Sequence, residues 1–248
     1  MLKRILLNNQ TLHKAYYSCG MLSILLQWIK SIIIPTKKID ISQYFNEING
    51  AISSLELKVF PMFGTLLCYY RDGDVKNTDD YDYAIFDLNS NVDHILKKLR
   101  GFGFSLMSLS YINLDGEDKL VELSFKYKEA RVDIFDLCIN GEEVIHRCPN
   151  FRKETPVISL FKKGITKNSF SSYFEVSYKK FNLELDDKIN IYLPELMNIE
   201  DIFVRHYGVD WKTPKKTNFI DYKFYKFLKS DSYCLQGEEK HLIEYIGS

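Results

Sequence analysis

The sequence predicts an α+β protein in which helices pack around a mixed β-sheet. Two neighbouring segments, residues 120–127 and 130–139, are rich in β-branched and aromatic residues and alternate in polarity, which indicates an antiparallel pair of strands. Three further segments, residues 40–54, 92–99 and 195–207, repeat their apolar residues at helical spacing. An α+β arrangement accounts best for strands and helices that follow one another in this irregular order.

Length and composition predict one main domain with an additional segment before it. The 248 residues include 46% hydrophobic residues, with 17 Tyr and 17 Phe, which is enough to bury a substantial core. Pro35 and the Thr-Lys-Lys that follows it indicate a connection between two parts of the chain. We therefore expect an N-terminal helical extension over residues 1–38 and a catalytic domain over residues 39–248.

The charge balance and the cysteines exclude several classes of function. Lys+Arg and Asp+Glu are equal at 33 each, so the protein has no overall positive field to attract nucleic acid, and no nucleic-acid partner is expected. The five cysteines are scattered and lack a C-x-x-C pair, which favours neither a disulfide framework nor a zinc cluster. The simplest expectation is a reducing, cytoplasmic location.

An apolar run over residues 20–34 is the one segment that points toward a membrane. Gln27 and Lys30 interrupt it, and it is shorter than the roughly 20 residues that a spanning helix needs. Packing into a core is the preferred interpretation. The alternative is an amphipathic helix that associates peripherally with the inner face of a membrane, or with a partner.

The remaining elements follow from local patterns. Gly, Pro and Asp residues mark the boundaries of the elements. Between these boundaries, β-forming residues indicate strands and helical spacing of apolar residues indicates helices. In chain order we expect a short apolar segment at 57–60, a helical turn from Phe63 to near Arg71, a turn at 72–74, a strand at 81–87, a helical or loop stretch at 157–163, a strand at 173–178 and a turn at 211–214.

Three aspartates are the best candidates for chemistry. Asp80 and Asp82 open a predicted strand, and their spacing of two places both carboxylates on one face, where they can hold one hard cation. Taken alone, the pair is more typical of a solvated turn. Asp133 lies inside an apolar strand, where a carboxylate is costly without a partner or a metal. Three carboxylates on adjacent strands would suit Mg²⁺ or Mn²⁺ beside a phosphate.

A glycine and a hydroxyl residue are candidates for binding the phosphate beside this metal. Gly64 and Thr65 stand at the start of a predicted helix, where backbone N–H groups can face an anion. The signal is weak on its own, and the chain contains no P-loop. The pair Gly101 and Gly103 ends a helix instead of opening one, so a dinucleotide fingerprint is not indicated either.

The order of these motifs resembles the LicD/fukutin family, and the fukutin side of it more than the choline enzymes. The resemblance extends over about residues 55–220. Its motifs are Phe63-Gly64-Thr65-Leu66-Leu67, Tyr70-Arg71, Asp79-Asp80-Tyr81-Asp82, Leu120-Val121-Glu122-Leu123-Ser124-Phe125, Val132-Asp133-Ile134-Phe135 and Tyr207-Gly208-Val209-Asp210-Trp211-Lys212-Thr213-Pro214.

The resemblance implies a nucleotidyltransferase-like fold and a role for each motif. Asp80, Asp82 and Asp133 correspond to the catalytic and metal-binding acids, and the substrate-binding residues are Gly64, Thr65, Tyr70 and Arg71. For the C-terminal aromatic motif, a structural role in the core is preferred over a functional role. Residues before 40 and over 140–190 have no counterpart, so acceptor recognition is expected there.

The leading hypothesis is a metal-dependent phosphotransferase. It would move phosphoribitol, phosphoglycerol or phosphocholine from a CDP-linked donor to a hydroxyl of a cell-surface glycan acceptor. One alternative is a nucleotidyltransferase that attaches a nucleoside monophosphate to a small molecule or a protein. The other is a glycan-assembly protein without catalytic activity.

Overall fold

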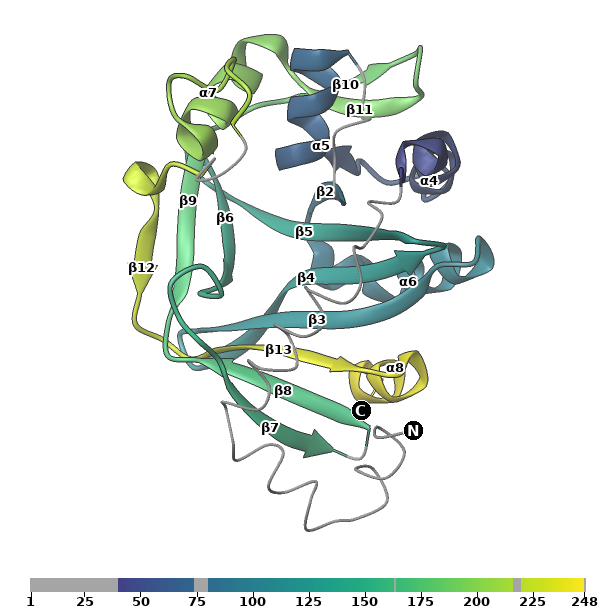
Figure 1. The fold of residues 1–248 in the computed structure, drawn as a ribbon, viewed down its shortest axis with the longest axis vertical. Helices are drawn as coiled ribbons and strands as arrows, with labels where there is room; N and C mark the ends of the chain where they lie inside the picture. Colours follow the sequence, from purple (N-terminus) through teal and green to yellow (C-terminus); the bar gives the residue numbers. More distant parts are fainter. Residues whose placement is uncertain (1–39, 74–79, 163, 216–219, 248) are drawn as a thin grey trace, which may run out of the picture. The chain divides into compact units, whose positions relative to one another are not determined.

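An eleven-stranded β-sheet organises the part of the chain that the computed structural model describes, and a separate two-stranded sheet accompanies it. The described residues are 40–73, 80–162, 164–215 and 220–247 (Figure 1). Five α-helices lie within these residues, which bears out the predicted α+β class.

The large sheet is mostly antiparallel. Its path runs β12-β9-β6-β5-β4-β3-β13-β8-β7, and β2 joins it by pairing with β5, while β1 pairs with β2. Its strands are β1 (Phe60–Pro61), β2 (Tyr81–Phe86), β3 (Ser105–Leu114), β4 (Glu117–Tyr127), β5 (Ala130–Asn140), β6 (Glu143–Pro149), β7 (Val157–Lys162), β8 (Ile165–Phe170), β9 (Tyr173–Lys179), β12 (Lys226–Leu228) and β13 (Ser232–Gly237).

The smaller sheet pairs β10 (Leu183–Asp186) with β11 (Ile191–Pro194). The pairing of β2 with β5 is parallel, whereas every other pairing among the described strands is antiparallel. The helices are α4 (Phe45–Ser53), α5 (Phe63–Leu67), α6 (Leu88–Gly101), α7 (Leu196–Tyr207) and α8 (Glu239–Ile246), together with the short helical turns Ser42–Tyr44, Cys68–Asp72 and Tyr222–Phe224.

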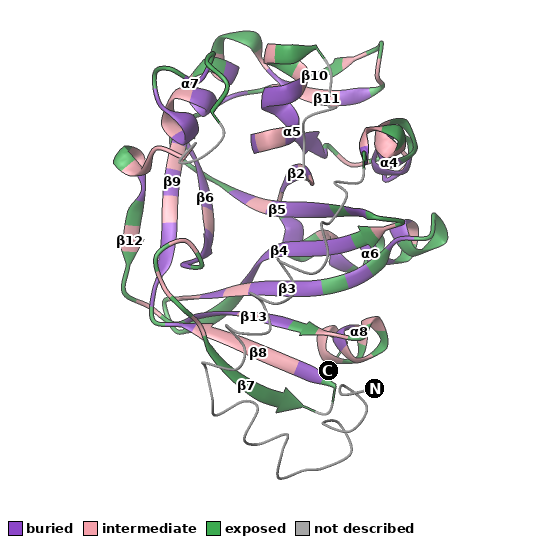
Figure 2. Ribbon diagram, viewed as in Figure 1, coloured by how far each residue is buried: buried purple, intermediate pink, exposed green. Residues whose placement is uncertain are grey.

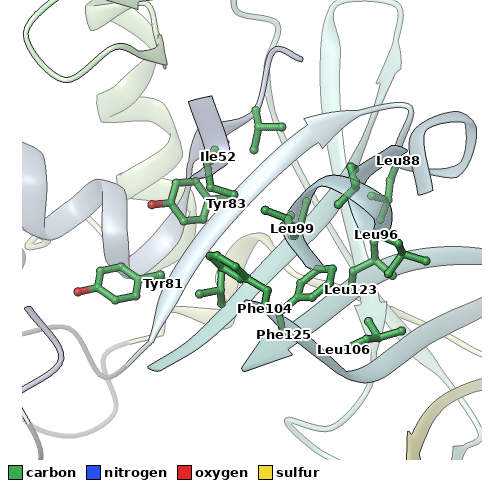
Figure 3. Close-up of a cluster of buried hydrophobic side chains, with 14 of the residues drawn as sticks. Ile52, Tyr81, Tyr83, Leu88, Leu96, Leu99, Phe104, Leu106, Leu123 and Phe125 are labelled. Atoms are coloured by element: carbon green, nitrogen blue, oxygen red, sulfur yellow. The ribbon is translucent and has the colours of Figure 1, made fainter. Parts of the chain in front are cut away.

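One face of the sheet carries the larger apolar core. Alternate residues of the central strands are fully buried there, among them Tyr83 of β2, Leu123 of β4 and Ile134 of β5. Helices α4, α6 and α8 contribute to the same cluster, for example through Leu99 and Leu242. Figure 3 shows several of these side chains gathered between β2, the central strands and α6. Because side chains alternate along a strand, the intervening residues face the other side of the sheet.

A second core forms where the sheet continues into β6 and β9. Helices α5 and α7 cover it, and its buried side chains include Phe60, Phe63, Phe174 and Phe203. The segment that follows α5, Cys68–Asp72, winds as a π-helix and ends at Gly73, whose φ of +66° requires the left-handed conformation that glycine adopts readily. This core holds α5 against β2, and α5 carries the residues that were predicted to face an anion.

The helical or loop conformation expected for residues 157–163 is wrong. Residues Val157–Lys162 form the edge strand β7, which pairs with β8 in an antiparallel hairpin. All six residues of β7 are exposed, as the uniformly green ribbon in Figure 2 shows. The strand is therefore exposed on both of its faces, and no alternation of polarity marks it in the sequence.

The other predicted elements are present within a few residues of their expected limits. Strands β4 and β5 form the expected antiparallel pair, and α4, α6 and α7 match the three segments with helical spacing. No helix within the described ranges is long and apolar enough to cross a membrane. The extension predicted over residues 1–38, including the apolar run at 20–34, lies outside the described residues.

Candidate metal centre

Three carboxylates converge at the start of β2 and β5. Asp80 immediately precedes β2, and Asp82 within it lies directly opposite Asp133 of β5 in the parallel register. Ligand oxygens of the three side chains all lie within 4.8 Å of one another. Asp133 is buried, and the other two are half-buried. The convergence that the sequence predicted for these residues is confirmed.

The strand pattern explains why these acids share one face. Tyr81 and Tyr83 are fully buried in the larger core, and so are Val132 and Ile134 on β5. With both apolar sets directed toward α4 and α6, the residues between them must face the opposite side of the sheet. The hydrophobic effect thus orients the acids before any metal contributes.

Helix α5 and Met62, the residue before it, fix Asp82 in place through three hydrogen bonds. The backbone N–H of Gly64 donates to Oδ2 of Asp82 over 3.0 Å, and the backbone N–H of Asp82 donates to Oγ1 of Thr65 over 2.7 Å. The N–H of Met62 donates to the Asp82 carbonyl over 2.9 Å. The acid is therefore held by both its backbone and its side chain.

These bonds change the role predicted for Gly64 and Thr65. Thr65 is completely buried, and its hydroxyl already accepts the N–H of Asp82, so contact between this side chain and a substrate is excluded in this conformation. The N–H of Gly64 faces an anion as expected, but that anion is the carboxylate of Asp82. The Gly-Thr pair orients a candidate metal ligand.

The backbone that presents Gly64 is strained. Phe63 has a φ of +43°, an uncommon value for a residue with a bulky side chain. Its ring packs against His206 at 4.5 Å between ring centroids, His146 at 4.8 Å and Phe135 at 5.2 Å. Such strain persists where packing determines the conformation, and it concentrates at functional sites.

Arg131 is the principal cation beside the triad among the described residues, and sequence reasoning missed it. Its Nε donates to Oδ1 of Asp133 over 2.9 Å, while its Nη2 lies 3.3 Å from Oε1 of Glu122 and 3.2 Å from Oγ of Ser124. Glu122 is itself buried and accepts a hydrogen bond from Ser110 over 2.6 Å. The spacing of two between Arg131 and Asp133 is the sequence signal that could have identified this pair, because it places both on one face.

The carboxylates of the triad repel one another. Burial raises the pKa of Asp82 well above its usual value, the charges of Asp80 and Asp133 raise it further, and the N–H of Gly64 opposes the shift. Burial, followed by the charge of Glu122, raises the pKa of Asp133 to about 7, although Arg131 acts in the opposite direction. Carboxylates that repel one another in this way are stabilised by a bound cation, and an all-oxygen donor set suits a hard divalent ion. The residues present therefore fit a Mg²⁺ or Mn²⁺ ion.

The predicted substrate residues Tyr70 and Arg71 lie on the π-helix beyond α5. The Arg71 guanidinium is paired in a bidentate manner with Asp72, at 2.7 and 2.8 Å, and its Nη1 donates to the carbonyl of Trp211 over 3.4 Å. Tyr70 is 38% exposed, and its ring lies 6.2 Å from that of Trp211. A π-helical turn is often found at functional sites. To bind a phosphate, Arg71 would have to share or exchange the carboxylate of Asp72.

The C-terminal motif belongs to the core, as interpreted from the sequence. Tyr207 and Trp211 are buried, and Trp211 packs on Phe203 with ring centroids 4.7 Å apart. Gly208 has a φ of +90°, and a Cβ at this position would lie 3.1 Å from Oδ2 of Asp221. The motif therefore supports α7 and the turn after it.

Two further acids are close to the triad in the sequence. Asp136 lies outside the site, because its Oδ1 accepts the backbone N–H of Leu88 over 2.8 Å at the first turn of α6. Asp79 lies outside the described residues. The candidate centre thus consists of Asp80, Asp82 and Asp133, with Arg131 beside them.

Comparison with known proteins adds no assignment. No protein-family model matches the sequence, and no curated protein matches it. The case for an activity therefore depends on the chemistry of the site and on the resemblance of its motifs.

Proposed function

We propose that this protein is a metal-dependent phosphotransferase that moves a phospho-alcohol group from a CDP-linked donor to a hydroxyl of a cell-surface glycan. The observation that carries the proposal is the convergence of Asp80, Asp82 and Asp133 within 4.8 Å on one polar face of the sheet. The order of motifs, which resembles the LicD/fukutin family, supplies the donor and acceptor classes. A nucleotidyltransferase-like fold is part of the same proposal.

In this proposal the three aspartates hold Mg²⁺ or Mn²⁺, which would offset the charge of the donor's diphosphate and align its leaving oxygen. Gly64 and Thr65 hold Asp82 at the orientation that such binding needs. Arg131 fixes the carboxylate of Asp133 through a single hydrogen bond. Positioning of this kind is most of what phosphoryl transfer requires from a protein.

The bond changes balance without any further reactant. The acceptor oxygen forms a bond to the phosphorus that carries the alcohol, and the bond from that phosphorus to the oxygen it shares with the CMP unit breaks. CMP leaves with that oxygen. The proton of the acceptor hydroxyl passes to the carboxylate of Asp133, the buried acid of the triad.

The test is a transfer assay with a matched pair of variants. CDP-choline, CDP-ribitol and CDP-glycerol, each labelled in the alcohol, are incubated with a panel of glycans in the presence of Mg²⁺ or Mn²⁺. We expect the label to appear on a glycan and Asp82→Asn to reduce this transfer by about 10²–10³-fold or more. Asp93→Asn, an exposed position on α6, is the control and should retain full transfer.

Two outcomes would overturn the proposal. If Asp82→Asn transfers the label as well as the parent protein does, the triad is not the catalytic centre. If nucleotides labelled in the base leave their label on the acceptor while the labelled alcohols do not, the reaction is nucleotidyl transfer. Circular dichroism of both variants verifies that a loss of activity is not a loss of fold.

A further inference from the structure

An open pocket adjoins the triad at the other end of Arg131. Its volume is about 610 Å³, which is in the range of sites for small organic ligands. Strands β3, β4, β5 and β13 and the first residues of α8 form its wall. Arg131 lines the pocket and also donates to Asp133, so one residue borders both the pocket and the candidate metal centre.

The strand register connects the pocket to the triad. Asp133 lies opposite Ser124 on β4, Ser124 lies opposite Ser108 on β3, and Ser108 lies opposite Gln236 on β13. These four strands run side by side in Figure 1. Because adjacent strands are roughly 4.8 Å apart, Gln236 stands three spacings, or roughly 14 Å, from Asp133 along this row. A row of polar side chains therefore leads from the acids into the pocket.

Three of the four charged residues that line the pocket form ion pairs, and Lys126 is the exception. Arg131 is paired with Asp133 and Glu122. Glu238 is paired with Lys240 at 3.0 Å, and Glu239 with Arg100 at 3.3 Å. Glu238 and Glu239 also stand at the N-terminal end of α8, where their carboxylates oppose the approach of an anion. These two carboxylates offset the charge of Lys126, so the lining gives an anion little net attraction.

The remaining lining groups suit hydroxyls. Ser105, Ser108 and Gln236 carry groups that both donate and accept hydrogen bonds, and Lys126 adds a flexible donor. Met107, 41% exposed, supplies an apolar contact on the same wall. The serine and glutamine groups can donate to a hydroxyl or accept from it, and Lys126 can donate to its oxygen, which matches a ligand with many hydroxyls.

We propose that this pocket binds an uncharged, polyhydroxylated acceptor, one hydroxyl of which passes Arg131 to reach Asp133. The inference rests on the proposed transfer reaction and adds to it the location and charge of the acceptor. It also moves acceptor recognition away from residues 140–190, because the pocket is lined by residues 105–108 and 236–239 together with Lys126 and Arg131.

Methionine methyl groups allow the pocket to be observed directly. The protein is labelled with ¹³C at the methionine methyls, and maltose, cellobiose and chitobiose are titrated against it, with a sulfated disaccharide as the charged comparison. We expect at least one neutral disaccharide to shift the signal of Met107 in the pocket. The signal of Met197, 91% exposed on α7, is the internal reference and should not shift.

A pair of glutamine variants tests the lining. Gln236→Ala should raise the Kd of that disaccharide about fivefold, the effect of losing one hydrogen bond. Gln43→Ala, on an exposed turn before α4, should leave the Kd unchanged. The proposal is overturned if none of the neutral disaccharides shifts Met107, if only the sulfated one does, or if Gln236→Ala binds as tightly as the parent protein.

The outcome is independent of the test for the transfer reaction. A disaccharide that shifts Met107 in a protein that transfers no labelled alcohol would leave the pocket assignment standing and remove the proposed function. Transfer that depends on Asp82, with no shift of Met107, would keep the function and place the acceptor elsewhere.

Discussion

The guanidinium of Arg131 donates to Asp133 across 2.9 Å on the polar face of the sheet, and it is half-exposed while Asp133 is buried. A candidate metal ligand is therefore held by a cation that water can reach. The arginine both orients this carboxylate and opposes the binding of a second positive charge beside it, which leads to the first prediction.

Replacing Arg131 with Met should lower stability and strengthen the response to metal. Loss of the guanidinium leaves Asp133 and Glu122 without their cationic partner. We therefore expect the free energy of unfolding in the absence of metal to fall by about 1–3 kcal/mol. This is less than for a fully buried ion pair, because Arg131 is half-exposed. Added Mg²⁺ should then raise the melting temperature more in the variant than in the parent. Urea unfolding with and without Mg²⁺ measures both effects.

The matched control is Arg100→Met, which removes a partly exposed ion pair with Glu239, a residue that lines the pocket but is not part of the triad. It should change stability by less than about 0.5 kcal/mol and leave the effect of Mg²⁺ unaltered. An equal effect of Mg²⁺ in both variants would contradict the placement of Arg131 beside the metal.

Stability without metal should increase as pH falls from 8 to 5. The pKa of Asp133 is raised to about 7 in the folded protein, and that of Asp82 is raised as well, so over this range the folded state binds more protons than the unfolded state does. The stabilisation that these two carboxyl groups contribute is largest at pH values below their pKa in the unfolded chain. It is lost as the pH rises through about 7. Asp133→Asn should reduce this dependence, as measured by urea unfolding at several pH values.

Metal should reverse that dependence. Binding requires the carboxylates to lose their protons, so the increase in stability that Mg²⁺ produces should diminish as pH falls below about 7. A stabilisation by Mg²⁺ that is the same at pH 5.5 and pH 8 would show that Asp133 is not a ligand.

Thr65→Val should weaken metal binding although Thr65 is no part of the triad. The variant removes the oxygen that accepts the N–H of Asp82 and leaves that buried donor without its partner, at a cost of about 1–3 kcal/mol in stability. We expect Mg²⁺ affinity to fall about 10–100-fold, as is typical when a group that orients a ligand is lost. Calorimetric titration measures the affinity. Thr213→Val, at an exposed position, is the control.

The acid triad could be predicted because its signal is local. In Tyr81-Asp82-Tyr83 and in Val132-Asp133-Ile134, burial of the flanking residues dictates the side on which the acid lies. Two strands with this pattern need only become neighbours for the acids to meet. The period of two along a strand carries all of this information.

The contacts of Arg131 could not be predicted in the same way. Glu122 lies opposite Phe135 in the register of β4 and β5, and Arg131 lies opposite Lys126, so the pair forms along a diagonal that depends on the length of the arginine side chain. The pocket could not be predicted from the sequence for a related reason. Ser105 and Gln236 come from distant parts of the sequence and meet only because β13 pairs with β3.

The parallel pairing of β2 with β5 has a consequence for how the protein folds. Asp82 and Asp133 are distant in sequence, and they become neighbours only when β2 is inserted beside β5, whereas β4 and β5 meet through a short hairpin. Non-local pairings close slowly relative to hairpins. The centre should therefore assemble after the hairpins, and a bound metal should act mainly by slowing unfolding, which the unfolding rate with and without Mg²⁺ measures.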